Sequence, residues 1–231
     1  MNKKKITAIA VVVAAVAIAI VGATLAFFTD ETEVVENTFT VGDINIDLDE
    51  VSTSEYGTPS EAGERVKKNE YKLIPGHEYT KDPTTYVEAK SEPCFVEMKV
   101  KVKGMDKLQE VVTKSDYPGY YDETKGGIFD FDMLVKDRNS AWTHVGMEGD
   151  DTYVFWYKGI VDARETDDIT LEPLFEHFVC PGFLTNEQVA EIEAGGFEWD
   201  ITSYAIQSAD MNDAKDAWAK SGFNNSVSYF N

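Results

Sequence analysis

The side chains best suited to metal or acid-base chemistry are few in this sequence and widely spaced. The 231 residues include three histidines and two cysteines. His177 and Cys180 have the His-x-x-Cys spacing that can hold zinc in a turn. In a strand, however, residues three apart point to opposite faces, and His177 alternates in phase with Phe175 and Val179. We therefore expect a half-buried strand histidine at this position, with no metal site and no bound cofactor.

No local signature of a common enzyme class is present. The sequence lacks the His-Glu-x-x-His motif of zinc peptidases, the Gly-x-Ser-x-Gly motif of hydrolases and a glycine-rich phosphate loop. Asp130 and Asp132 could act as an acid-base pair only inside a cleft, which a sequence cannot reveal. We therefore predict no catalytic residues and no enzymatic activity.

Oxygen-bearing side chains alternate along one predicted strand, at Asp43, Asn45, Asp47 and Asp49. They would line one face of the strand, and oxygen atoms are the ligands that Ca²⁺ prefers. Side chains on one face of a strand are nearly ~7 Å apart, so a single strand cannot surround an ion without ligands from a loop. We expect a solvated face here rather than a calcium site.

Cys94 and Cys180 are the only cysteines, and two states are open to them. In an exported protein they could form a disulfide, which would add roughly 4 kcal/mol to stability through the long loop that it closes. In a reducing habitat they would instead be two buried free thiols. The sequence does not decide between these alternatives.

The first thirty residues have the three parts of an export signal. Lysines at positions 3–5 precede an uncharged apolar run at 6–21, and small side chains follow at Thr24 and Ala26. This pattern predicts cleavage between Ala26 and Phe27 and a secreted or cell-surface protein. The alternative is an uncleaved anchor, because an apolar run of roughly 20 residues can cross a bilayer. Either alternative places the remainder of the chain outside the cytoplasm.

The formal net charge of −21 at pH 7 excludes some classes of partner. So acidic a surface repels phosphate backbones and anionic lipid. We expect no nucleic-acid partner, and contact with a membrane only through an uncleaved signal segment. The charge favours cations or basic partners, or it serves only to keep an exported protein soluble.

Most of the chain beyond the signal segment has the pattern of β-strands. At 96–103 apolar residues occupy even positions and charged residues odd ones, which is typical of a strand with one buried face. The apolar phase changes at Gly42-Asp43, where a β-bulge would keep both halves facing the core. Many short strands without alternating helices predict an all-β fold, an antiparallel β-sandwich or jelly roll. Further strands are predicted at 79–89, 129–136, 152–157, 169–179 and 199–207.

Two short helices are predicted to cover the ends or the edge of this sandwich. Thr185 and Gln188 have the form of a capping box at the start of the first, and Gly195-Gly196 supplies its stop. The second spans 213–220, where apolar residues recur at helical spacing.

Three parts of the chain resemble exported proteins of the TasA/camelysin family from Gram-positive bacteria. The most specific is Ala-Thr-Leu-Ala-Phe-Phe-Thr-Asp at 23–30, followed by Asn-Thr-Phe-Thr-Val-Gly-Asp-Ile-Asn-Ile-Asp-Leu at 37–48. A Pro-Gly turn leading into Lys-Asp-Pro-Thr lies at 73–84, and the third part combines 201–207 with 214–218. The resemblance implies a jelly-roll protein whose signal peptide is removed by a dedicated signal peptidase of the SipW type.

The resemblance also implies a structural role in extracellular biofilm-matrix fibres. In fibre-forming members, the segment freed by signal cleavage is donated as a strand to the neighbouring subunit. The corresponding arm here is 27–37, between a signal peptide at 1–26 and a β-sandwich domain at 38–231. We therefore expect self-association, or assembly with related matrix subunits. The candidate anchors of the arm are Phe27, Phe28, Val34 and Val35.

Three alternatives to this role remain at the level of the sequence. The arm could fold back onto its own sheet or form a tail, so that no fibre results. The protein could be a monomeric surface-binding module whose acidic loops engage cations or a host or cell-wall ligand. It could also be a metal-dependent peptidase, as camelysin has been described, although no matched position supplies a zinc-binding helix.

Overall fold

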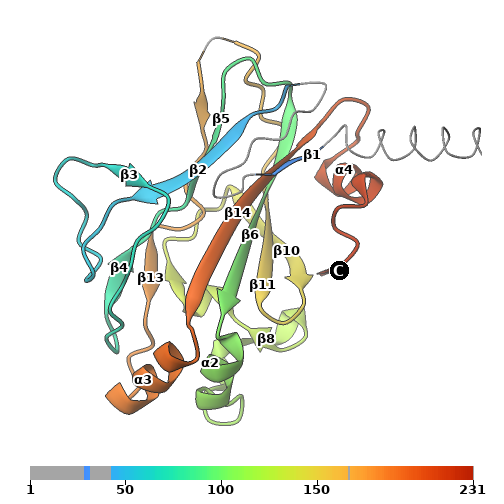
Figure 1. Cartoon of the computed structure of the whole chain (residues 1–231). Helices are drawn as coiled ribbons and strands as arrows, with labels where there is room; N and C mark the ends of the chain where they lie inside the picture. The colour runs from blue at the N-terminus through green and yellow to red at the C-terminus, as the bar shows by residue number, and fades with distance from the viewer. Residues whose placement is uncertain (1–28, 32–42, 166, 231) are drawn as a thin grey trace, which may run out of the picture.

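The described part of the chain consists mainly of antiparallel β-strands (Figure 1). The computed structural model describes residues 29–31, 43–165 and 167–230. The predicted signal helix, the cleavage site at Thr24, Ala26 and Phe27, all four candidate anchors and Gly42 of the predicted bulge lie outside these ranges. None of the helices within them is long and apolar enough to span a bilayer. The predicted all-β fold class is confirmed.

A six-stranded antiparallel sheet forms one layer, in the order β1-β14-β6-β11-β10-β15. Its centre is the ladder between β6 and β14, which pairs Cys94 with Gln207 at one end and Lys103 with Glu198 at the other. This ladder is the longest of the sheet, and it runs diagonally through Figure 1. The strands are β1 Thr29–Glu31, β6 Cys94–Lys103, β10 Trp142–Glu148, β11 Thr152–Tyr157, β14 Glu198–Gln207 and β15 Val227–Tyr229.

Two smaller antiparallel sheets pack against this layer, in the orders β12-β5-β2-β3 and β4-β13-β9. The side-chain hydroxyls of Thr85 in β5 and Ser203 in β14 form a buried hydrogen bond between the layers. A fourth sheet pairs β7 Tyr121–Asp122 with β8 Ile128–Phe129. The remaining strands are β2 Ile46–Val51, β3 Arg65–Val66, β4 Glu78–Thr80, β5 Thr84–Val87, β9 Val135–Lys136, β12 Ile169–Thr170 and β13 His177–Val179.

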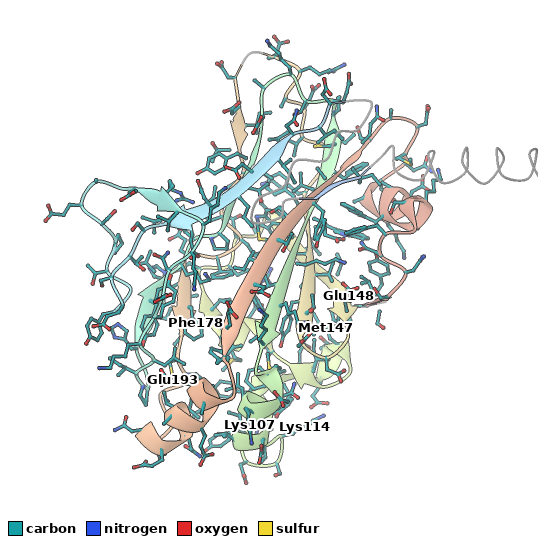
Figure 2. The ribbon with its side chains drawn as sticks, in the orientation of Figure 1. Lys107, Lys114, Met147, Glu148, Phe178 and Glu193 are labelled. Carbon is teal, nitrogen blue, oxygen red and sulfur yellow. The ribbon has the colours of Figure 1, made fainter. Side chains whose placement is uncertain are left out.

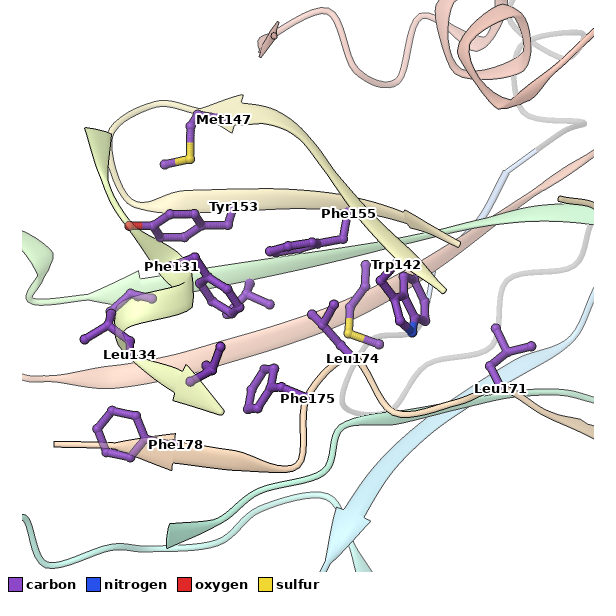
Figure 3. Packing of buried hydrophobic residues seen from close by; sticks show 14 of the residues in the cluster. Phe131, Leu134, Trp142, Met147, Tyr153, Phe155, Leu171, Leu174, Phe175 and Phe178 are labelled. Carbon is purple, nitrogen blue, oxygen red and sulfur yellow. The ribbon is translucent and has the colours of Figure 1, made fainter. Parts of the chain in front are cut away.

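The core between the layers is rich in aromatic side chains (Figure 3). The ring of Phe131 lies 4.9 Å from that of Phe155, 5.0 Å from that of Tyr153 and 5.7 Å from that of Phe175. The even-numbered residues of β6 face this core, as the alternating pattern predicted, and are completely buried. They are Cys94, Val96, Met98, Val100 and Val102.

Both predicted helices are present, and a third was not predicted. Helix α3, Asn186–Ala194, begins at the predicted capping box of Thr185 and Gln188, and α4 spans Ala214–Ser221. Helix α2, Met105–Val111, follows directly after β6. Its seven residues are too few for an amphipathic pattern to stand out in the sequence.

Three of the predicted strands are interrupted. Pro83 separates β4 from β5 because proline cannot donate to a strand ladder. Between β8 and β9 the chain forms a 3₁₀ turn, η3 Phe131–Met133, and the side chain of Asp130 caps it by accepting from the amide of Asp132. The predicted strand at 169–179 is present only at its ends, as β12 and β13. The segment 116–127 contains β7 and two further 3₁₀ turns, η1 Pro118–Tyr120 and η2 Glu123–Lys125.

The outer face of β6 is also buried around Glu97 and Lys99, which the alternating pattern did not predict. Glu97 is completely buried and Lys99 nearly so. Glu97 accepts hydrogen bonds from Trp156 Nε1 at 2.8 Å and Asn224 Nδ2 at 2.5 Å. Helix α4 and the chain that follows it cover this face, and Trp218 of α4 shares a buried cluster with Phe95 of β6 and Ile206 of β14. The C-terminal segment is therefore held by a second, smaller core around a buried carboxyl group.

We predict that Glu97 makes the stability of the protein depend on pH. Burial raises the pKa of Glu97 to about 7, against the hydrogen bonds and the charge of Lys99, which lower it. The native state therefore holds this proton more tightly than an unfolded chain, whose glutamates titrate near ~4.3. The stabilisation is fully present below the unfolded-state pKa of ~4.3. As the pH rises from there to 7, the free energy of unfolding falls by about 3 kcal/mol.

Urea unfolding of the native protein and the Glu97→Gln variant between pH 4.5 and 8 tests this. The variant should lack this loss of unfolding free energy, whereas Glu61→Gln, at an exposed position, should retain it. An identical pH dependence in all three proteins would contradict the assignment.

Candidate functional site: the open edge of strand β14

Strand β14 is fully paired on one edge and mostly open on the other. All ten residues pair with β6, whereas β1 pairs only with Tyr204, Ala205 and Ile206 on the opposite edge. From Glu198 to Thr202 no strand in the described ranges pairs with this second edge. An open strand edge presents main-chain donors and acceptors to which another strand can pair.

A groove of about 550 Å³ lies beside this open part of β14. It is bounded by β14, by β2 and the chain that follows β3, by β13 and by the end of α3. Figure 2 shows two of its lining residues, Phe178 on β13 and Glu193 on α3. The apolar part of the lining consists of Leu48, Tyr71, Leu73, Phe178, Phe197, Trp199 and Ile201.

Hydrogen bonds fix the outer wall of the groove. The side chain of Asn69 donates to the carbonyl of Val51 at 2.8 Å and accepts from the amide of Thr53 at 2.9 Å. The amide of Leu73 donates to Glu193 Oε1 at 3.2 Å, which ties this wall to α3. The hydroxyl of Tyr71 donates to the carbonyl of Thr80 at 3.0 Å, and burial raises the pKa of Tyr71 far above its usual range. The groove therefore has walls held by long-range contacts.

Trp199 forms part of the groove floor and carries an unused donor. Its ring packs edge-on against Phe178, with centroids 5.0 Å apart. Its Nε1 atom is buried and has no hydrogen-bond partner among the described residues. Buried donors are nearly always paired in folded proteins, so Trp199 Nε1 lacks an acceptor that the described residues do not supply. A chain segment with main-chain carbonyl groups could supply the missing acceptor.

The rim of the groove is charged, and its ions are paired across strands. Lys81 and Glu50 form a nearly buried ion pair. Arg65 of β3 bridges Asp49 and Asp82, with its Nη2 atom 2.8 Å from Asp49 Oδ1. Asp47 pairs with Lys67. The alternating carboxylates of β2, Asp47 and Asp49, are thus bound by basic side chains.

The two cysteines are free and buried in the structure, which corresponds to the second of the two states that the sequence leaves open. Cys94 begins β6 and lies opposite Gln207. Cys180 lines a small cavity with Leu108, which belongs to the helix that follows the other end of β6. A ten-residue strand is ~30 Å long. Disulfide formation requires Cα atoms within ~7 Å, and this separation prevents it.

The three histidines do not converge on one site. His77 Nε2 contacts the carbonyl of Tyr56 at 2.9 Å, and burial lowers the pKa of His144 to about 4. His177 lies half-buried in β13, as predicted, and Cys180 is not among its potential co-ligands. Within the described ranges, the group that could hold a metal ion consists of Asp137, Glu176 and His177. This is one imidazole with two exposed carboxylates, unlike the His₃, His₂Glu or Cys₂His sets of catalytic zinc sites.

Asp130 and Asp132, the candidate acid-base pair, both have structural roles. Asp130 caps η3, and Asp132 forms an ion pair with Arg138, so the two carboxylates do not face each other across a cleft. The described residues thus define an antiparallel β-sandwich with an open strand edge beside an aromatic groove.

Residues 2–56 match the family described as camelysin metallo-endopeptidase. The N-terminal segment of the chain is thus similar to this family, and the resemblance seen in the sequence is confirmed for that segment. It covers less than a quarter of the chain and ends shortly after β2. No curated protein and no solved structure matches the chain.

We predict that both thiols resist modification in the native protein. Burial raises the pKa of Cys94 to about 12 and that of Cys180 to about 11, so almost no thiolate is present at pH 8. Ellman's reagent should react with both at least ~100-fold more slowly in the native protein than in guanidinium chloride, where two thiols per chain should appear. A count of zero thiols in the denatured chain would show that the disulfide forms after all.

Proposed function

We propose that the protein is a non-catalytic, extracellular structural subunit that assembles into fibres by donation of its N-terminal arm. The observation that supports this proposal is the pairing of β1 with β14. Thr29, Asp30 and Glu31 belong to the arm expected from the sequence, and they already lie on the edge that the arm would fill. Among the described residues, this pairing leaves the edge beside the groove without a partner strand.

The register of β1 specifies how a longer arm would fit. Thr29 lies opposite Ile206 and Glu31 opposite Tyr204. An arm extended in the same register would bring Val34 opposite Ile201 and Asn37 opposite Glu198. Directly opposite residues share one face of a sheet, and Ile201 lines the groove, so Val34 would enter it. Val35 would lie opposite Asp200, on the other face.

The length of the chain favours donation to a neighbour over complete pairing within one chain. Asp43 lies near the Gln207 end of β14, because its carbonyl accepts from the amide of Glu92, two residues before Cys94. Asn37 would lie at the other end of β14, ~30 Å away. The six Cα–Cα steps from residue 37 to residue 43 span at most about 21 Å, which is too short for the chain to return. Donation to a neighbouring subunit removes this constraint, because the arm then pairs with β14 of one subunit while its own residue 43 belongs to another.

The physical gain from donation has two parts. Main-chain hydrogen bonds satisfy the open edge, and an apolar side chain fills the groove and fixes the register. Each subunit would donate and accept through different surfaces, so the contact repeats head to tail and gives a filament.

Export completes the proposal. We infer that a SipW-type signal peptidase cleaves after Ala26 and frees the arm. The chain would then consist of a signal peptide at 1–26, the arm at 27–37 and the β-sandwich domain at 38–231, as expected from the sequence. The N-terminal family match supports this inference because it spans the segment that would be cleaved and donated. The protein would then be secreted or held at the cell surface, in a matrix of like or related subunits.

The word endopeptidase in the family name does not change the proposal. The acidic and histidine side chains described above do not form a typical zinc-peptidase ligand set. A second candidate function is a monomeric binding module, favoured by the groove itself, whose volume lies within the range of small-molecule pockets.

Electron microscopy of two matched variants tests the fibre proposal. Val34→Asp would place a charge in the groove and should abolish filaments, reducing filament mass at least ~10-fold through the cost of burying an unpaired carboxylate. Val35→Asp makes the same substitution one residue further on, where the register places it on the opposite face, and should leave filaments intact. Equal loss in both variants would contradict the register, and a native protein that stays monomeric would favour the binding module.

A further inference from the structure

A second polar cluster lies on the far side of β13 from the groove. Phe178 points into the groove region, and its neighbour His177 points to the opposite face of the three-stranded sheet. His177 pairs with Thr80 of β4 and Lys136 of β9. Asp137 follows β9 directly, and Glu176 precedes His177. Three neighbouring strands thus bring an imidazole and several carboxylates to one surface.

The ligand atoms of this cluster have the spacing of a metal coordination shell. His177 Nδ1 lies 3.3 Å from Asp137 Oδ2 and 3.7 Å from Glu78 Oε1. One ligand atom each from Asp137, Glu176 and His177 all lie within 4.8 Å of one another. Two ligands at ~2.05 Å from a tetrahedral ion are about 3.3 Å apart. The distance between the Asp137 and His177 atoms therefore matches that of two ligands of one such ion.

The Nδ1 atom of His177 lacks a hydrogen-bond partner among the described residues. This atom is also buried. Its contact with Asp137 lies at an ion-pair distance but is not a hydrogen bond. A buried nitrogen without a partner is costly, and a bound cation would remove that cost.

We propose that Asp137, Glu176 and His177 bind a divalent transition-metal ion, of which Zn²⁺ is the best match, as a structural site. An imidazole nitrogen with carboxylate oxygens suits Zn²⁺ and its transition-metal neighbours, whereas Ca²⁺ and Mg²⁺ prefer oxygen ligands alone. The ion would join the end of β9 to β13 on the outer face of the sheet. This inference is independent of fibre assembly.

Lys136 lowers the affinity of the proposed site for a metal ion. Its ammonium group forms an ion pair with Glu78, whose Oε1 atom also lies near His177 Nδ1. That pairing keeps Glu78 away from the ion and places a positive charge beside it. Replacing Lys136 should therefore free a fourth ligand and remove repulsion, so that the metal binds more tightly.

Titration calorimetry of the purified protein with ZnCl₂ tests the site. Asp137 has a left-handed backbone, with φ of 56°, which asparagine tolerates. Asp137→Asn should weaken zinc binding at least ~10-fold, as expected when one ligand of a metal site is lost. Asp210 also has a left-handed backbone, with φ of 59°, and Asp210→Asn is the matched control that should bind as the native protein does.

Two further variants separate a metal site from general surface charge. His177→Val should abolish one-to-one binding, whereas His77→Gln should leave it unchanged. Lys136→Met should tighten binding several-fold, an effect that a merely structural ion pair would not produce. The proposal fails if the native protein binds no zinc below millimolar concentration, or if Asp210→Asn or His77→Gln weakens binding as much as Asp137→Asn.

Discussion

The pairing of β14 is the interaction on which the rest of the structure depends. Its ladder with β6 joins the aromatic core on one face to the buried Glu97 network on the other. Because β6 satisfies only one edge of β14, the other edge needs a partner, and β1 supplies one for three residues. The unpaired remainder lies beside the groove, so the same strand that organises the core also defines the candidate assembly site.

The two faces of the six-stranded sheet perform different tasks. The inner face packs against the smaller sheets and forms the core and the groove. The outer face is closed near Phe95 and Ile206 by α4, which leaves a buried carboxyl group hydrogen-bonded to Trp156 and Asn224. Closure of that face limits strand addition to the edges of the sheet. The functional proposal therefore concerns an edge and not a face.

Local patterns predicted the elements well, whereas the site depended on contacts distant in the sequence. Alternation predicted β6, the capping box predicted α3, and the even-phase residues entered the core. The burial of Glu97 was missed because Asn224, 127 residues away, covers it. The groove was missed for the same reason: Leu73 and Glu193 meet across 120 residues. His177 was predicted as a strand residue, but its approach to Asp137 depends on strand pairing, which sequence spacing does not reveal.

The central claim is that the arm of one chain completes β14 of another. Cysteines introduced at Asn37 and Glu198 test it directly, because the register places these positions opposite each other while the chain is too short to join them within one molecule. After mild oxidation, the account predicts a ladder of covalent oligomers on a non-reducing gel, each band one subunit larger than the last. A monomer with an internal cross-link, or no cross-link at all, would contradict it.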